Sequence, residues 1–289
     1  MQRVESIAAL RLILDKARDA GKTIGFVPTM GALHTGHLEL VQQAVSENDT
    51  VVCSIFVNPA QFNDPKDLVN YPRTLDTDAK ALTTKGCQFL FAPTVQEMYP
   101  HGPELFPHDF GAIETVLEGH HRPGHFKGMA LVVDKLFGIV NPNRAYFGEK
   151  DFQQLAIVTL LAAKLHPNIR IVPCPTVREE DGLAMSSRNQ LLTAKERAEA
   201  PALYKSMLYF KEHMGSMTPV ELQAKCVADL NARSTITVQY FEIVNSLSMQ
   251  SVQTWQDPGP WRLCLAALVT DGSSDSRKVR LIDNLLLKP

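Results

Sequence analysis

Two histidines near the start of the chain stand where a phosphate could be bound. His34 and His37 are three residues apart at the end of the run 28–37, which directly follows the apolar stretch 23–27. A strand is expected to turn into a helix here, so that backbone N–H groups and the positive end of a helix dipole face outward. Imidazole donors can follow charge that develops on a phosphate, and the interleaved glycines let a nucleotide approach the backbone. The run predicts a site for the phosphates of ATP.

Two other interpretations of the histidine pair stay open. The rings could have ordinary surface roles at a helix start. They could also bind zinc, although the pair lacks the i,i+4 spacing and the general-base glutamate of the HExxH helix, and no third ligand is evident.

Two further segments carry polar side chains after apolar stretches. Asn58 and Gln61 follow the stretch 50–57, and their carboxamides offer a donor and an acceptor together, which suits a hydroxyl or amide substrate. Pro59 could equally mark an Asx-type turn that binds nothing. The segment 122–128 holds Arg, His and Lys between glycines, and it is either an anion-binding loop or a solvated basic turn.

Two later segments also suit a nucleotide. In 148–151 the glycine frees a backbone N–H, Lys150 is a point charge fit for a phosphate, and Asp151 either caps the next helix or contacts a ribose. The segment 178–189 joins two serines to Arg188 and could wrap a triphosphate and close after binding, or serve as a solvated linker. Five loops that could bind an anion are expected along one α/β domain. Solvent-exposed turns without a ligand explain the five together less well than they explain any single loop.

The order of the expected elements favours an α/β fold. Apolar stretches rich in β-branched residues alternate with stretches of helical periodicity, which indicates βαβ units and a parallel sheet. Ligands of such sheets bind beyond the carboxyl ends of the strands, where the segments 29–37, 58–61 and 177–188 are expected. The expected strands are 23–27, 50–57, 88–91 and 169–172, and the expected helices are 6–20, 38–45, 74–84, 129–140 and 151–165.

The pattern changes after about residue 176. Capping boxes at 193–196 and 218–221 open helices, the second with proline at the first helical position. Short strands are expected at 237–244, 262–269 and 279–282. We therefore predict a Rossmann-like parallel-sheet domain over residues 1–176 and a smaller α+β domain over residues 177–289, with 177–189 as the hinge.

Composition excludes several classes of protein. The 289 residues are 45% hydrophobic and 21% charged, as in ordinary globular proteins. The net charge of −2 is spread along the chain, so no basic field recruits nucleic acid or a membrane surface. Five scattered cysteines without a CxxC pair argue against a disulfide framework and suit a reducing compartment. Because no signal-like segment or apolar run of roughly 18 residues is present, we expect a cytoplasmic protein.

Taken in order, the motifs resemble those of the pantoate–β-alanine ligase (pantothenate synthetase) family. His34-Thr-Gly-His37 resembles the HxGH signature of the nucleotidylyltransferase superfamily, and Met185-Ser-Ser-Arg188 resembles its mobile phosphate loop. Two departures are small: Ala60 stands where relatives often carry Met or Thr, and a His-His pair precedes Arg122 where small residues are more usual. The matching blocks cover essentially the whole chain and are 27–34, 54–62, 71–74, 122–126, 147–155, 181–189 and 280–284.

The resemblance implies ATP-dependent amide formation in two steps. The carboxylate of pantoate attacks the α-phosphorus of ATP and gives an enzyme-held pantoyl adenylate and pyrophosphate. The amine of β-alanine then displaces AMP and yields pantothenate. Magnesium would accompany ATP, held largely by phosphate oxygens, and a homodimer is expected.

The resemblance also implies roles for individual residues, with His37 as the principal catalytic group. The catalytic set would be His34, His37, Lys150 and Arg188. The ATP-binding set would be Met30, Gly31, Ala32, Leu33, His34, Thr35, Gly36, His37, Gly148, Glu149, Lys150, Asp151, Val177, Met185, Ser186, Ser187 and Arg188. The set for pantoate and β-alanine would be Asn58, Gln61, Tyr71, Arg122, His125 and Gln154, with the two glutamines on pantoate.

Two other functions remain as alternatives. Another HxGH-type nucleotidylyltransferase would act on a phosphorylated acceptor, and its acceptor pocket would require more arginine than the carboxamides of Gln61 and Gln154 provide. A non-catalytic ATP-binding scaffold would tolerate the loss of His37, and the presence of both histidines together with Lys150 and Arg188 disfavours it.

Overall fold

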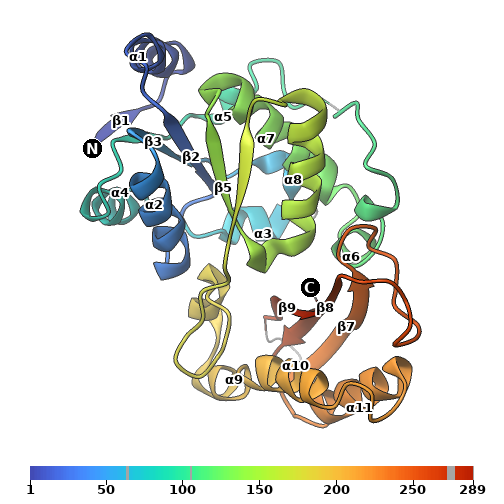
Figure 1. Cartoon of the computed structure of the whole chain (residues 1–289). Helices are drawn as coiled ribbons and strands as arrows, with labels where there is room; N and C mark the ends of the chain where they lie inside the picture. Colours follow the sequence, from blue (N-terminus) through green and yellow to red (C-terminus); the bar gives the residue numbers. More distant parts are fainter. Residues whose placement is uncertain (63–64, 105, 272–276, 289) are drawn as a thin grey trace. The chain divides into compact units, whose positions relative to one another are not determined.

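The chain divides into two compact units (Figure 1). The computed structural model describes residues 1–62, 65–104, 106–271 and 277–288. The N-terminal unit comprises Met1–Glu149 and Gln153–Pro175, and the C-terminal unit comprises Lys150–Phe152 and Thr176–Pro289. We keep the division into functional domains at residues 176 and 177 as a proposal.

A six-stranded sheet forms the centre of the N-terminal unit, and all its described pairings are parallel. The Rossmann-like parallel sheet is thereby confirmed. Its inner strands are buried on both faces, which is why they appear in the sequence as continuous apolar runs. In spatial order the strands are β1 (Gln2–Val4), β4 (Phe89–Phe91), β3 (Thr50–Ile55), β2 (Ile24–Thr29), β5 (Arg144–Gly148) and β6 (Arg170–Cys174).

Helices cover both faces of this sheet (Figure 1). On one face lie α1 (Ile7–Asp19), α7 (His125–Val140) and α8 (Phe152–Leu165), and on the other lie α2 (Thr35–Glu47) and α4 (Leu75–Thr84). The shorter helices are α3 (Pro65–Asn70), α5 (Val95–Met98) and α6 (Glu118–His121), with 3₁₀ turns η1 (Pro59–Gln61), η2 (Gly111–Glu114) and η3 (Glu149–Asp151). Within the described part of the chain, no helix has the length and apolarity needed to cross a bilayer.

The order in which the chain adds strands to the sheet reverses between β2 and β5. These two strands pair in parallel, with Gly25 opposite Arg144, and the chain leaves β2 towards β3 but leaves β5 towards β6. Such a switch point opens a crevice at the carboxyl ends of the two strands, where ligands of α/β sheets bind. The segment 30–37 follows β2. Gly148 is the last residue of β5, and Glu149 follows it.

Most expected elements are present, with shifted ends. Helix α2 begins at Thr35 instead of residue 38, because His34 already serves as its N-cap. Strands β1 and β5 were not expected from the sequence. They are three and five residues long, so neither contains enough alternation for a periodic signal, and their pairing with distant strands defines them.

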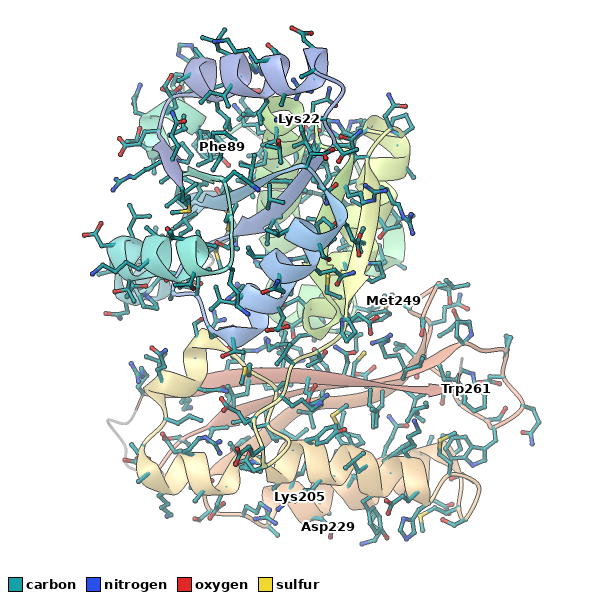
Figure 2. All side chains as sticks on the ribbon, turned by 60° about the vertical axis from the view of Figure 1, so that its left-hand side comes forward. Lys22, Phe89, Lys205, Asp229, Met249 and Trp261 are labelled. Carbon is teal, nitrogen blue, oxygen red and sulfur yellow. The ribbon has the colours of Figure 1, made fainter. Side chains whose placement is uncertain are left out.

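The C-terminal unit is built on a three-stranded antiparallel sheet of β7 (Ile236–Asn245), β8 (Trp261–Val269) and β9 (Val279–Lys288). Figure 2 labels Lys205 on α10 (Ala202–Glu212) and Asp229 on α11 (Pro219–Asn231), and both helices lie along this sheet. Helix α9 (Ala194–Glu199) and the 3₁₀ turn η4 (Ser187–Leu191) precede them. Both expected capping boxes are present, at the starts of α9 and α11. The smaller α+β unit is confirmed.

Candidate active site

The loop between β2 and α2 places two histidines at the start of a helix. His34 is the N-cap of α2, and its Nδ1 accepts a hydrogen bond from the N–H of Gly36 at 3.1 Å. The N–H of His34 donates in turn to Nδ1 of His37 at 3.4 Å, and the ring centroids are 4.0 Å apart. These bonds satisfy N–H groups that the first turn of a helix leaves without a partner.

The same hydrogen bonds determine which ring nitrogen carries the proton. A nitrogen that accepts a backbone N–H holds no proton, so the neutral rings of His34 and His37 carry theirs on Nε2. Each histidine therefore has an Nε2–H donor beside the positive end of α2. This combination suits the oxygens of a phosphate.

A carboxylate that sequence analysis missed holds the preceding loop. Asp78, on α4, is 2% exposed and accepts hydrogen bonds from the N–H groups of Ala32 and Leu33, each at 2.9 Å. Nothing in the sequence near Asp78 distinguishes it from an acid that complements a helix dipole.

Gln61 and Asn58 lie together just beyond β3. The Nδ2 of Asn58 donates to Oε1 of Gln61 at 3.2 Å, and Nε2 of Gln61 donates to Sδ of Met30 at 2.9 Å. Asn58 is completely buried, and it also donates to the carbonyl of Gly128 at 3.0 Å and accepts from the hydroxyl of Tyr99 at 2.9 Å. Its carboxamide is thus used inside the unit, and we propose that it acts by orienting Gln61.

Arg122 and His125 join the same cluster through the backbone of Gln61. Nδ1 of His125 lies 2.8 Å from the carbonyl oxygen of Gln61, and Nε2 lies 3.0 Å from Nη1 of Arg122. A carbonyl only accepts and a guanidinium only donates, so the proton of this ring is on Nδ1. His125 therefore links Arg122 to the turn that carries Gln61.

Close packing at the start of α7 requires a glycine. A Cβ at Gly128 would collide with the carbonyl of Ala60 and would lie 2.8 Å from Cα of Gln61. Gly128 therefore lets helix α7 approach the turn η1 until His125 and Asn58 reach their partners.

The two adjacent glutamines of α8 have different surroundings. Gln153 is 4% exposed; its Oε1 accepts from the N–H of Glu118 at 3.0 Å, and its Nε2 donates to the carbonyl of Ile113 at 2.6 Å. This side chain holds the segment before α7 in place. Gln154 is half-buried and stays the candidate for pantoate. Tyr71 packs edge-on against Phe62, with 5.7 Å between ring centroids.

Lys150 belongs to the C-terminal unit, where β9 holds its backbone. Nδ2 of Asn284 donates to the carbonyl of Lys150 at 2.9 Å, and Oδ1 of Asn284 accepts from Nη1 of Arg262 at 2.5 Å. The guanidinium of Arg262 also lies over the ring of Phe152, 4.4 Å from its centroid. Sequence analysis found residues 280–284 as a family block but assigned Asn284 no role.

The segment 177–188 forms a bridged turn instead of an open linker. The N–H of Met185 donates to the carbonyl of Val177 at 3.0 Å, and Arg178 pairs with Ala184 as an isolated antiparallel bridge. Ser186 then caps the turn η4, because its hydroxyl accepts from the N–H of Arg188 at 3.2 Å. Ser187 is buried, whereas Met185, Ser186 and Arg188 are half-buried.

The structure therefore groups the expected site residues into two sets. The N-terminal unit holds the segment 30–37, Asn58, Gln61, Tyr71, Arg122, His125, Gly148, Glu149 and Gln154, and the C-terminal unit holds Lys150, Asp151, Val177 and the segment 185–188. Within the first unit, hydrogen bonds join Met30, Asn58, Gln61, Arg122 and His125. That the two sets meet around one bound ATP stays a prediction.

Neither thiol chemistry nor a metal cage is evident in the described part of the chain. No group of three or more His, Cys, Asp or Glu side chains there could hold a metal ion. All five cysteines are buried thiols, and burial raises the pKa of Cys87 to about 11 and that of Cys174 to about 12. Such thiols stay protonated near neutral pH and are poor nucleophiles.

Comparison with known proteins gives matches over the full length of the chain. The family model for pantoate–β-alanine ligase matches residues 2–286. A pantothenate synthetase of Phocaeicola vulgatus is 48% identical, with all of both chains covered, and one of Porphyromonas gingivalis is 45% identical over 99% of each.

Solved structures agree with the sequence matches. The pantothenate synthetase of Thermus thermophilus superposes with a TM-score of 0.89 at 41% identity, covering all of both chains. A pantoate–β-alanine ligase of Francisella tularensis, solved with β-γ ATP and β-alanine, gives a TM-score of 0.82 at 36% identity, covering 99% of this chain and 97% of that one. On these matches, this chain belongs to the pantoate–β-alanine ligase family.

Proposed function

We propose that the protein joins pantoate to β-alanine with ATP, through a pantoyl adenylate, and releases AMP and pyrophosphate. The observation that carries this proposal is the histidine pair at the switch point of the sheet, in a chain that matches the ligase family over its whole length. The Francisella relative solved with β-γ ATP and β-alanine supports the same substrates.

In the first step the pantoate carboxylate attacks the α-phosphorus of ATP, the new C–O–P linkage forms, and pyrophosphate leaves. Negative charge builds on the phosphoryl oxygens during this step, and the Nε2–H groups of His34 and His37 would donate to them. Lys150 and Arg188 would pair with the phosphates that leave.

The pantoate would be held by Gln61 and Gln154, with Arg122 and His125 nearby. Positioning and charge stabilisation supply the acceleration, so no covalent intermediate with the protein is needed.

In the second step the β-alanine amine attacks the acyl carbon of the adenylate and AMP leaves with the electrons of the C–O bond. The adenylate makes this displacement possible because AMP is a much better leaving group than the oxygen of a free carboxylate. The amine must be neutral to attack, so it loses its proton before or during the step. The segments 148–150 and 185–188, whose residues are half-buried or buried, would keep the adenylate from water.

Three finer features belong to the proposal. Magnesium would be bound chiefly by ATP oxygens, which fits a donor set without a cage in the described residues, and it would neutralise phosphate charge. The protein would be a homodimer, which sedimentation would test. It would work in the cytoplasm, for which buried cysteine thiols are suited.

The decisive experiment is an assay with ATP, pantoate, β-alanine and magnesium, scored for pantothenate and AMP, with each component omitted in turn. Pyrophosphate release that requires pantoate but not β-alanine would support the two-step scheme. Turnover of a phosphorylated acceptor without pantoate would instead indicate a nucleotidylyltransferase.

Replacement of Gln61 by alanine is expected to raise KM for pantoate much more than KM for ATP. The Gln61 amide is oriented by Asn58 beside Met30, so its loss should remove a contact with the small acid and spare the nucleotide. Initial rates with each substrate varied separately provide the measurement. Gln42→Ala, which removes an exposed glutamine on α2, is the control. Equal changes in both constants would argue against a contact between Gln61 and pantoate.

Replacement of Arg188 by alanine is expected to weaken the handling of ATP phosphates and to spare the second step. Its guanidinium would pair with phosphate oxygens, and such charge-assisted bonds are among the stronger polar contacts. Pyrophosphate release should slow, while pre-formed pantoyl adenylate should react with β-alanine at nearly the normal rate. Arg233→Ala, at an exposed position of the same unit, is the control. The reverse pattern would place Arg188 on the amine side.

A further inference from the structure

We propose that Asp78 is a positioning residue, which shapes the loop before the histidine pair so that both rings present their Nε2–H groups. This inference rests on the proposed role of His34 and His37 in adenylate formation. It adds a residue that no sequence motif singles out and that does not itself touch the reacting atoms.

The contacts of Asp78 converge on the loop backbone. Its Oδ2 accepts from the N–H of Ala32 and its Oδ1 from the N–H of Leu33, both at 2.9 Å. The hydroxyl of Thr74 donates to Oδ2 at 3.1 Å and so fixes the carboxylate from its own helix. With 2% of Asp78 exposed, water competes little for these bonds.

Two successive residues of the loop have a positive φ, a backbone conformation whose cost in free energy neighbouring contacts must offset. Ala32 has a φ of +49°, in the left-handed region that residues with a Cβ seldom adopt. Gly31 precedes it with a φ of +84°, and a Cβ there would lie 3.0 Å from Cγ2 of Ile55 and 3.2 Å from Oδ2 of Asp78. The two residues therefore bring the backbone close to the carboxylate that holds it.

Side-chain packing and the hydrogen bonds of Asp78 act on different parts of this loop. A cavity of about 310 Å³ is lined by Met30, Gly31, Thr74 and Asp78, among other residues. The cavity leaves one side of Met30 and Gly31 open, whereas Ile55 packs closely against Gly31 and Leu33 packs against the hydrophobic core. The carboxylate, bonded to two successive N–H groups, constrains the backbone of Ala32 and Leu33.

A change in this loop would reach the histidines directly. The backbone N–H of Leu33 donates to Asp78, and Leu33 directly precedes His34 in the chain. The N–H of His34 in turn donates to Nδ1 of His37. That bond is 3.4 Å long, near the limit for a hydrogen bond, so a small rotation at residue 33 would break it. His37 could then take its proton on Nδ1 and would lose the donor on Nε2.

The test is Asp78→Asn, which keeps size and shape but replaces one acceptor oxygen by an NH₂ group. One backbone N–H would then face a donor. We expect kcat for pantoate-dependent pyrophosphate release to fall by roughly 10- to 100-fold, as misplaced catalytic groups typically cause. KM for pantoate should stay within about twofold, because the hydrogen bond from Asn58 that orients Gln61 does not involve this loop. Nitrogen-15 spectra of the histidine rings should show a mixture of tautomers in place of Nε2–H alone.

Asp49, an exposed carboxylate that also accepts from a backbone N–H, offers a control. It accepts from the N–H of Thr23 at 2.9 Å and from its hydroxyl at 2.7 Å, at the amino end of β2, away from the histidine loop. Asp49→Asn should leave kcat and the tautomers of the His34 and His37 rings unchanged. Equal losses in the two variants, or normal kcat and tautomers in folded Asp78→Asn, would overturn the proposal.

Two further arms keep the test decisive. If Asp78→Asn does not fold, Thr74→Val removes the hydroxyl that fixes the carboxylate, and unchanged tautomers in that variant would overturn the proposal. If the wild-type protein makes no pantothenate, the proposed function fails, but the ring spectra of the same variants still decide whether Asp78 positions the histidines.

Discussion

Replacement of His37 by alanine is expected to lower kcat for formation of the pantoyl adenylate by about 10²-fold or more, the usual effect of losing a donor to developing charge. Nδ1 of His37 accepts from the N–H of His34, which leaves Nε2–H as the donor for the phosphates that we propose bind at the start of α2. The measurement is pantoate-dependent pyrophosphate release in a single turnover. Normal turnover in the variant would refute the role of His37.

Two amide variants separate catalysis from helix capping, because alanine also removes the acceptor for the N–H of His34. Loss of such a cap lowers the free energy of unfolding by about 1 kcal/mol. In His37→Asn the amide oxygen can replace Nδ1 as acceptor, but no donor reaches the position of Nε2. In His37→Gln the amide nitrogen can reach that position. We therefore expect His37→Gln to recover part of the rate and His37→Asn to recover stability only; the opposite result would assign His37 a structural role.

Local sequence predicted the fold well where burial is periodic or continuous. The strands β2 and β3 are buried on both faces and have the apolar runs expected of central parallel strands. The capping box at the start of α11 was also predicted, because its two partners, Thr218 and Glu221, are three residues apart. Strand β5 was missed, since its pairing with β2 and β6 joins residues far apart in the chain.

The residues of the candidate site also divide into those with a local sequence pattern and those defined by contacts with distant parts of the chain. The motif residues, such as His34 and Gln61, are recognisable because residue type and spacing are local. Asp78 and Asn284 are not, because they act on backbone groups 46 and 134 residues away. Asn58 shows a third case: its type suggests a substrate contact, whereas complete burial gives it a supporting task. Long-range hydrogen bonds to backbone leave no local pattern in a single sequence.

Replacement of Arg178 by methionine is expected to lower the free energy of unfolding of the C-terminal unit by about 3 kcal/mol, because it leaves a buried carboxylate without its counter-charge. Arg178 donates to Oδ2 of Asp283 at 2.6 Å and to Oδ1 at 2.9 Å, and its guanidinium lies 3.7 Å from the ring centroid of Tyr204. The Asp283 side chain is only 5% exposed. Urea unfolding followed by tryptophan fluorescence isolates this unit, since both tryptophans, Trp255 and Trp261, lie in it.

A second Arg–Asp pair in the same unit, which is more exposed, provides a comparison for the effect of burial. Arg197 donates to Asp181 at 2.5 Å, but the two side chains are 35% and 36% exposed. Arg197→Met should therefore lower the free energy of unfolding by about 1 kcal/mol or less, as for other exposed pairs. The double variant Arg178→Met/Asp283→Leu should recover much of the loss, because it removes the buried charge together with its partner. Equal losses in Arg178→Met and Arg197→Met would mean that burial of the Asp283 carboxylate does not set the strength of its pairing with Arg178.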